Sequence, residues 1–162
     1  GAPVSYVTDA PQGEDRKLTA AAARQGVIHL GSELGGGGTI TMAALKTARE
    51  GTLRALRLVG ALADEVAVPA SSPTRLMQVR GADYYTYAPD SGFFEPLVEL
   101  GDEVVAGQEA GLIHFHDTPW REPSVARFQR DGIVLCKRMP CRTQRGDCLF
   151  HLGTDYEDDR AA

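Results

Sequence analysis

One acidic residue, Glu33, lies between an apolar run and four consecutive glycines, in the stretch GVIHLGSELGGGG (residues 26–38). The apolar run 27–30 predicts a short strand, and the glycines predict a flexible turn into a helix. A carboxylate at the C-terminal end of a strand in an α/β layer lies where such folds place their active sites. Glycines carry no side chains, so a substrate could approach closely. Glu33 is therefore a candidate general acid or base; the alternative is a solvated or capping glutamate.

The same glycines do not predict a nucleotide site. A phosphate-binding P-loop requires lysine after its last glycine, whereas Gly38 is followed by Thr39 and Ile40. The dinucleotide pattern GxGxxG would require glycine at Ile40 or Thr41. Without Glu33, a hinge-like connection would be the better interpretation of the run.

Two histidines, His114 and His116, alternate in the stretch LIHFHD. On a strand they would point the same way, and such a pair can hold a metal ion with a third ligand from elsewhere. The chain contains no His-x-x-Glu and no His-x-x-x-His pattern. Partly exposed strand histidines are the favoured interpretation, and a metal site on this pair stays as the alternative.

Three cysteines, Cys136, Cys141 and Cys148, are odd in number and lie close together. Their spacing is not CxxC, which disfavours a zinc knuckle. The pattern fits reduced thiols and a cytoplasmic location better than a disulfide framework.

The composition excludes several partners. With 162 residues, 43% of them hydrophobic, the chain can bury one core or two small ones. A net charge of −5 shows no concentration of positive charge, so we expect no nucleic-acid partner. No apolar run approaches the roughly 20 residues that cross a membrane, so no membrane partner is expected. The chain starts without methionine or a signal peptide, which predicts a piece of a longer protein.

The pattern of elements predicts an α+β fold. Helices are expected over 14–25 and over 39–50, the second capped by Thr39 or Thr41 and interrupted at Gly51, after which Thr52 would cap a further helix. Helix, strand, glycine turn and helix form the pattern of an α/β layer. The predicted organisation has four parts: an α/β domain over 1–66, a Pro/Ser-rich linker over 67–74, a β-barrel domain over 75–153 and an acidic tail over 154–162.

The β half shows eight short apolar segments separated by Gly, Pro and Asp. It also contains a weak repeat: an apolar segment followed by Gly101-Asp102 in the first copy and by Gly146-Asp147 in the second, where the connection is five residues longer. Gly-Asp suits a tight turn, and two such hairpins predict a quasi-symmetric barrel. The aromatic residues of this half are expected in the core or at an interface rather than in a pocket; they are Tyr84, Tyr85, Tyr87, Phe93 and Phe94.

The combined pattern resembles the succinylglutamate desuccinylase/aspartoacylase family, zinc-dependent amide hydrolases related to the M14 carboxypeptidases. The resemblance rests on the ELGGGG turn with its flanking elements and on the β half, over roughly residues 20–153. Within the family, the bacterial members that deacetylate N-acetyl-diaminobutyrate in ectoine breakdown are most similar. The β half looks like the family's hammerhead-like barrel, a degenerate biotinyl/lipoyl-like domain that has lost the carrier lysine.

The resemblance implies a role for Glu33. It matches the glutamate of the family's Glu-x-Gly-Gly motif, with Gly35 and Gly36 giving the substrate access. That glutamate deprotonates a zinc-bound water, which attacks the amide carbonyl, and then protonates the leaving amine. The family's zinc ligands, a His-x-x-Glu pair and a later histidine, precede this motif and are missing here. We therefore expect this chain alone to bind no stoichiometric zinc and to hydrolyse no N-acyl amino acid.

Two functions follow from different classes. The first is a zinc-dependent amidohydrolase of N-acyl amino acids, with a small-molecule substrate and a barrel that shapes the cleft and forms homo-oligomer contacts. The second is a non-enzymatic hammerhead-type binding or oligomerisation module, with the helices as its dimerisation platform.

Overall fold

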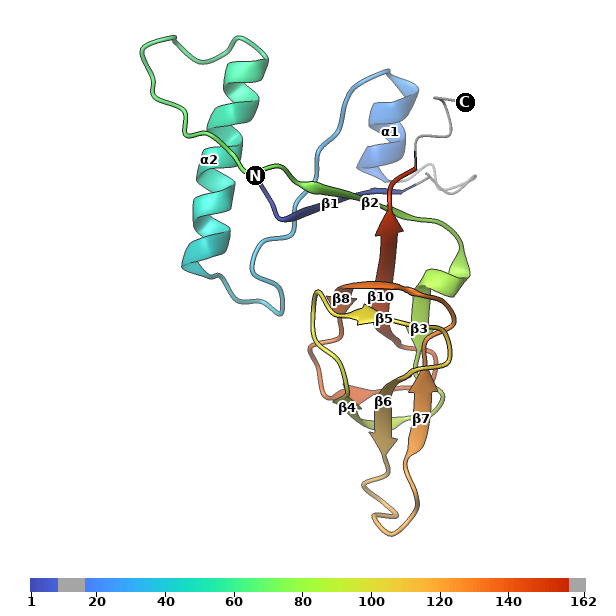
Figure 1. Ribbon diagram of the computed structural model, residues 1–162. Coiled ribbons are helices and arrows are strands. Elements are labelled where there is room, and N and C mark those ends of the chain that lie inside the picture. The colour runs from blue at the N-terminus through green and yellow to red at the C-terminus, as the bar shows by residue number, and fades with distance from the viewer. Residues whose placement is uncertain (9–16, 158–162) are drawn as a thin grey trace. The chain divides into compact units, whose positions relative to one another are not determined.

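The computed structural model describes residues 1–8 and 17–157 (Figure 1). Its internal contacts divide the chain into two compact units. Unit 1 holds Gly1–Ser5 and the described residues up to Arg75, and unit 2 holds Tyr6–Thr8 and the described residues from Leu76 onward. The described α-helices belong to unit 1 and nearly all strands to unit 2. This segregation confirms the α+β class, while the predicted domain boundaries and the hammerhead-like barrel stay predictions.

The first helix of unit 1, α1, spans Leu18–Arg24. It lies inside the predicted helix 14–25, of which residues 14–16 fall outside the described part. Four consecutive alanines explain its formation, because alanine has the highest helix propensity. Gly26 ends it at φ +66°, a conformation that glycine adopts without steric cost. The Gly26 N–H donates to Ala23 and the next N–H to Ala22, so the last carbonyls of the helix are satisfied.

The second helix, α2, runs without interruption over Met42–Leu58. The expected break at Gly51 is wrong, because an interior glycine costs a helix only about 1 kcal/mol relative to alanine. Glu50 offsets part of this cost: it pairs with Lys46 at 2.8 Å and with Arg54 at 3.6 Å, one helical turn to each side.

Thr41 is the N-cap of α2, since its hydroxyl accepts a hydrogen bond from the Ala44 N–H at 3.1 Å. Thr52 caps nothing; its hydroxyl donates to the carbonyl of Ala48 within the helix.

The strand expected over residues 27–30 does not form. These residues, and those up to Thr41, have neither helix nor strand in the structure. A strand needs a neighbour to satisfy its backbone N–H and C=O groups. In the described part of the chain no strand pairs with this run. The strand predicted from this apolar pattern is therefore wrong, because no described strand offers it a pairing partner.

Unit 2 is built from short antiparallel strands that form two sheets (Figure 1). The larger sheet has the order β1-β2-β10-β8-β5, with β3 also paired to β10. Its strands are β1 (Val4–Thr8), β2 (Arg75–Val79), β3 (Tyr85–Tyr87), β5 (Glu103–Val104), β8 (Gly132–Lys137) and β10 (Cys148–Asp155). The smaller sheet has the order β7-β6-β4-β9. Its strands are β4 (Gly92–Pro96), β6 (Glu109–His114), β7 (Ser124–Arg127) and β9 (Arg142–Thr143).

All eight predicted β segments contain a strand, so this part of the prediction is confirmed. The segment 83–89 also holds a short 3-10 helix, η1 (Ala82–Tyr84). The two-residue strand β9 was not predicted.

Both sheets of unit 2 contribute to one buried core. Phe150 on β10 contacts Phe94 of β4, with ring centroids 5.6 Å apart, and Phe128, at 5.4 Å. The core prediction for the aromatic residues holds for Tyr84 and Phe94, which are almost fully buried. Tyr85 is partly buried and packs against the core. The prediction is wrong for Phe93, which is 43% exposed and lines a pocket. Tyr87 is nearly half exposed, so for it the interface alternative stays a prediction.

One tight turn occurs three times in unit 2. It spans residues 99–102, 105–108 and 144–147, with glycine at its third position and φ between +83° and +90°. In each copy the side-chain oxygen of the fourth residue accepts the N–H of the first, and the fourth N–H donates back to the first carbonyl. The expected Gly-Asp turns are thus confirmed, and a third copy with glutamine in place of aspartate was missed.

Candidate functional site

Glu33, the predicted catalytic residue, lies in the extended segment that precedes the glycine turn of unit 1. The whole segment 31–40 is exposed, and Glu33 itself forms no hydrogen bond or ion pair with any described residue. A carboxylate without a partner is free to exchange a proton with a bound molecule. The geometry is therefore compatible with proton transfer by Glu33, and its catalytic role stays a prediction.

The turn after Glu33 requires glycine. Gly35, Gly36, Gly37 and Gly38 all have positive φ, between +57° and +88°. A Cβ at Gly35 would clash with the carbonyl oxygen of Thr39, which leaves no room for a side chain. A Cβ at Gly36 would meet nothing within 4 Å, so this glycine is required for its backbone conformation and not for space. The open side of Gly36 is consistent with the access predicted for it, which stays a prediction.

The two histidines of the LIHFHD stretch lie in unit 2 and have separate partners. β6 ends at His114, whose Nε2 lies 2.5 Å from Oε2 of Glu95 on the neighbouring strand β4. His116 lies beyond the strand, with its Nε2 3.0 Å from Oδ1 of Asp117. The expectation that both histidines share one strand face therefore fails, because the strand ends before the second one.

The described residues do not fit a zinc centre. No group of three or more His, Cys, Asp or Glu side chains in residues 1–8 and 17–157 is arranged to hold a metal ion. A structural zinc site needs four such ligands and a catalytic one usually three. The pairing of each histidine with its own carboxylate gives two separate pairs instead.

Burial shifts the pKa of two further side chains of unit 2, a thiol and an imidazole. Burial raises the pKa of the Cys148 thiol, so at neutral pH it holds its proton more firmly than a free cysteine. Burial also lowers the pKa of His151, which stacks on Tyr85 with ring centroids 4.5 Å apart. The ring of His151 is neutral at physiological pH and contributes to packing.

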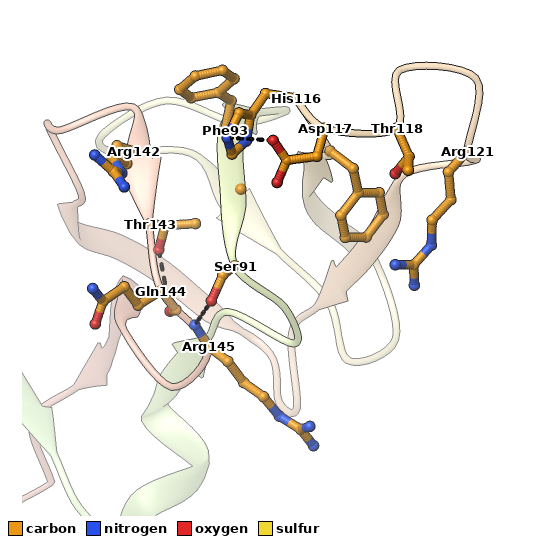
Figure 2. Close-up of a pocket in the computed structure, with 12 residues that line it drawn as sticks. Ser91, Phe93, His116, Asp117, Thr118, Arg121, Arg142, Thr143, Gln144 and Arg145 are labelled. Atoms are coloured by element: carbon orange, nitrogen blue, oxygen red, sulfur yellow. Dashed lines mark hydrogen bonds and ion pairs between the residues drawn. The ribbon is translucent and has the colours of Figure 1, made fainter.

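Unit 2 also contains a pocket of about 730 Å³ that the sequence did not predict (Figure 2). Strand β4, the loop between β6 and β7, and strand β9 with its following turn line it. Its polar groups include three arginines, Arg121, Arg142 and Arg145, and one carboxylate, Asp117. The arginines are 24 residues apart at most and share no regular spacing, so only the sheet pairing brings them together.

Helices long and apolar enough to span a bilayer do not occur in the described parts of the chain.

Comparison with known proteins identifies the family of the chain. No protein-family model matches. The N-alpha-acetyl-L-2,4-diaminobutyric acid deacetylase of Halomonas elongata is 32% identical over 129 residues, which are 80% of this chain and 37% of that protein. The crystal structure of a succinylglutamate desuccinylase/aspartoacylase from Rhodobacter sphaeroides is 33% identical, with a TM-score of 0.84 over 97% of this chain. The chain belongs to the succinylglutamate desuccinylase/aspartoacylase family. The predicted resemblance is confirmed.

The fold of this desuccinylase/aspartoacylase family member is shared more widely. The product-bound ectoine utilization protein EutE (DoeB) from Ruegeria pomeroyi, 24% identical, has a TM-score of 0.82 over 94% of the chain. The chain spans less than half the length of these relatives: 37% of the deacetylase, 46% of the Rhodobacter protein and 45% of EutE. The relatives are named as deacetylase, desuccinylase and aspartoacylase, so the family is one of amidohydrolases.

Proposed function

We propose that the protein acts as an amidohydrolase of N-acyl amino acids and that Glu33 is its general acid/base. The observation that carries the proposal is the 32% identity to a deacetylase of Nα-acetyl-2,4-diaminobutyrate, together with the unpartnered Glu33 before its glycine turn. This substrate class makes Nα-acetyl-2,4-diaminobutyrate the first compound to test.

The chemistry that this chain would supply is proton transfer. The carboxylate of Glu33 takes a proton from the attacking water and passes it to the nitrogen of the leaving amine. Gly35 and Gly36 carry no side chains, which leaves the approach to this carboxylate open. The zinc that the family implies would be held by residues other than those described, since these offer no suitable set of ligands.

The experiment uses the full-length protein encoded by the gene and its Glu33→Gln variant. Glutamine keeps the size of the side chain and removes the proton transfer, so kcat should fall by about 10²- to 10⁴-fold with little change in KM. Glu65→Gln is the matched control, because Glu65 is also an exposed glutamate of unit 1 without a partner among the described residues.

The outcomes separate two levels of the proposal. Wild-type turnover with an unaffected Glu33→Gln variant would overturn the role of Glu33 while leaving the activity in place. A full-length protein that hydrolyses no N-acyl amino acid would overturn the activity itself.

A second candidate function is a binding or oligomerisation module. It is favoured by unit 2, which closes a core of its own and carries a pocket. Homo-oligomer formation belongs to this proposal, and light scattering on the 162-residue chain tests it; a monomeric mass at all concentrations would contradict it.

A further inference from the structure

The pocket of unit 2 differs from the rest of the unit in how its arginines are paired. Elsewhere in unit 2 arginines form ion pairs with acids: Arg127 with Glu109 at 2.8 Å, Arg130 with Asp83 at 3.1 Å and Arg138 with Asp147 at 2.8 Å. The three pocket arginines have no acidic partner among the described residues. The one carboxylate that lines the pocket, Asp117, pairs with His116. The pocket therefore has an excess of positive charge in a chain of net charge −5.

Local structure holds the arginine on the β6–β7 loop in place. A tight turn with proline at its second position, residues 118–121, is closed by the Arg121 N–H donating to the Thr118 carbonyl at 2.9 Å. The guanidinium of Arg121 then lies over the ring of Phe115, 3.8 Å from its centroid. This stacking restricts the side chain and leaves its N–H groups available for a ligand.

The other two arginines come from β9 and its turn. Arg142 pairs with Phe93 across β9 and β4, and because Thr143 is buried, the alternation of the strand places Arg142 on the outer face. Arg145 occupies the second position of the turn 144–147, where its own N–H donates to the hydroxyl oxygen of Ser91 at 2.9 Å. That bond uses the oxygen of Ser91 as an acceptor and leaves its O–H to donate. Figure 2 shows the three arginines on different sides of the pocket.

We propose that this pocket binds a small organic polyanion, a molecule that carries several carboxylate or phosphate groups. Guanidinium groups and a hydroxyl supply donors, and anionic oxygens are the acceptors that they match best. Their separation around the pocket requires more than one anionic group on the ligand. The exposed ring of Phe93, 43% accessible, offers an apolar surface to the ligand's carbon skeleton. A volume of about 730 Å³ suits a small molecule.

The test is a titration of the ¹⁵N-labelled 162-residue chain at low ionic strength with citrate, an organic tricarboxylate, and, separately, with fructose 1,6-bisphosphate, an organic bisphosphate. Saturable shifts of the amide signals of Ser91, Phe93 and Gln144 are expected for at least one of them. The preferred probe then tells whether carboxylate or phosphate groups are recognised.

Substitutions assign the site. Arg142→Gln and Arg145→Gln should each weaken binding about tenfold, the effect of one lost charge-assisted hydrogen bond. Arg49→Gln is the matched control, an exposed arginine on α2 without a partner among the described residues, and it should bind as the wild type does. Circular dichroism checks that the variants keep their fold. If one of the two pocket variants does not fold, the other one alone still tests the site.

Three results would overturn the proposal. The first is the absence of saturable binding by both probes. The second is an equal loss of affinity in Arg49→Gln, which would mean that the anions respond only to overall charge. The third is a short single-stranded oligonucleotide that binds through the same arginines more tightly than either probe, which would assign the surface to nucleic acid.

Discussion

The two units of the molecule carry similar apolar residues and treat them in opposite ways. In unit 1, Ile28 is 89% exposed and Leu58 is 86% exposed, and neither α1 nor α2 buries a single residue. In unit 2, Ile113, Leu149 and Leu152 are completely inaccessible to solvent. Hydrophobicity along the sequence therefore shows which residues are suited to burial. Whether burial happens depends on the elements that stand opposite to them.

The difference arises from how each unit satisfies its backbone. The strands of unit 2 pair antiparallel and satisfy one another's N–H and C=O groups, including pairs far apart in the sequence such as β2 with β10 and β4 with β9. Unit 1 relies on isolated helices, whose hydrogen bonds are internal. Side chains of α2 add polar contacts: Arg57 donates to the carbonyl of Val66 at 2.6 Å and Arg54 to that of Pro69 at 3.0 Å. Polar contacts thus organise unit 1, and an apolar core organises unit 2.

The largest expected effect comes from truncating the core of unit 2. Phe150→Ala removes a ring that is 1% exposed and contacts two further aromatic rings, so it should lower the free energy of unfolding by about 3–5 kcal/mol. Urea denaturation followed by tyrosine and tryptophan fluorescence measures it.

Ile28→Ala in unit 1 is the control for the core truncation. This exposed side chain should change the free energy of unfolding by less than about 0.5 kcal/mol. Similar losses at both positions would mean that unit 1 buries Ile28 in solution, and the contrast between the units would fail.

Glycine-to-alanine substitutions should have smaller effects on stability, and these effects should have opposite signs in the two units. In unit 2, a Cβ at Gly111 would lie 2.5 Å from Cε2 of Phe94 and 2.7 Å from the carbonyl oxygen of Glu95. Gly111→Ala should therefore destabilise unit 2 by about 1–3 kcal/mol. In unit 1, a Cβ at Gly51 would meet nothing within 4 Å, so Gly51→Ala should stabilise α2 by about 1 kcal/mol.

Thermal unfolding and far-ultraviolet circular dichroism measure both glycine substitutions. The expected results are a lower melting temperature for Gly111→Ala and an increased helical signal for Gly51→Ala. A helical signal that falls in the second variant would show that α2 packs closely against another element at Gly51.

The smallest effect concerns the turn carboxylate Asp147 in unit 2. The Gln144 N–H hydrogen bond, followed by the nearby Arg138, lowers the pKa of Asp147 below its usual value. A lowered folded-state pKa stabilises the protein above the unfolded value of about 3.9, and this contribution disappears as the pH falls through the folded-state pKa. Asp147→Asn can still accept the Gln144 N–H but does not titrate. The melting temperature of the wild type should therefore exceed that of the variant at pH 7, and the difference should shrink below about pH 4.

Glu122→Gln serves as the control for this pH series, because Glu122 is exposed and has no partner in the described part of unit 2. Its melting temperature should follow the wild type at every pH. A constant difference between wild type and Asp147→Asn from pH 7 to pH 3 would contradict the role assigned to the carboxylate.

The sequence predicted unit 2 better than unit 1 for a physical reason. Alternating apolar residues between turn signals indicate short strands from the local sequence alone, so all eight β segments were found, although their pairing, such as that of β4 with β9, is not local. The prediction of a strand over residues 27–30 failed because a strand forms only beside a pairing strand, and the local sequence pattern does not reveal whether one is present. The prediction of a helix break at Gly51 failed because the Glu50 ion pairs and the helical residues on both sides outweigh the low helix propensity of one glycine.

The candidate sites show the same contrast: the site formed by residues close in the sequence was predicted, and the site formed by strand pairing was not. Glu33 was singled out because its neighbours in the sequence are also its neighbours in space. The arginine pocket was missed because Arg121, Arg142 and Arg145 come together only through the pairing of β9 with β4 and the loop after β6. A net charge of −5 also concealed this local excess of positive charge.

The repeated turn of unit 2 separates what must stay constant from what is free to vary. Its third and fourth residues form the same backbone bridge in all three copies: the glycine N–H donates to the carbonyl of Phe128, Val134 or Ala88, and the N–H of that residue donates back to the fourth residue. The second position takes no part in this bridge and holds leucine, alanine or arginine at residues 100, 106 and 145. A new side chain can be acquired there by mutation without disturbing the sheet. The arginine at the third of these positions lines the pocket. A side chain that contacts a ligand can therefore be introduced at this position of the turn with little loss of stability.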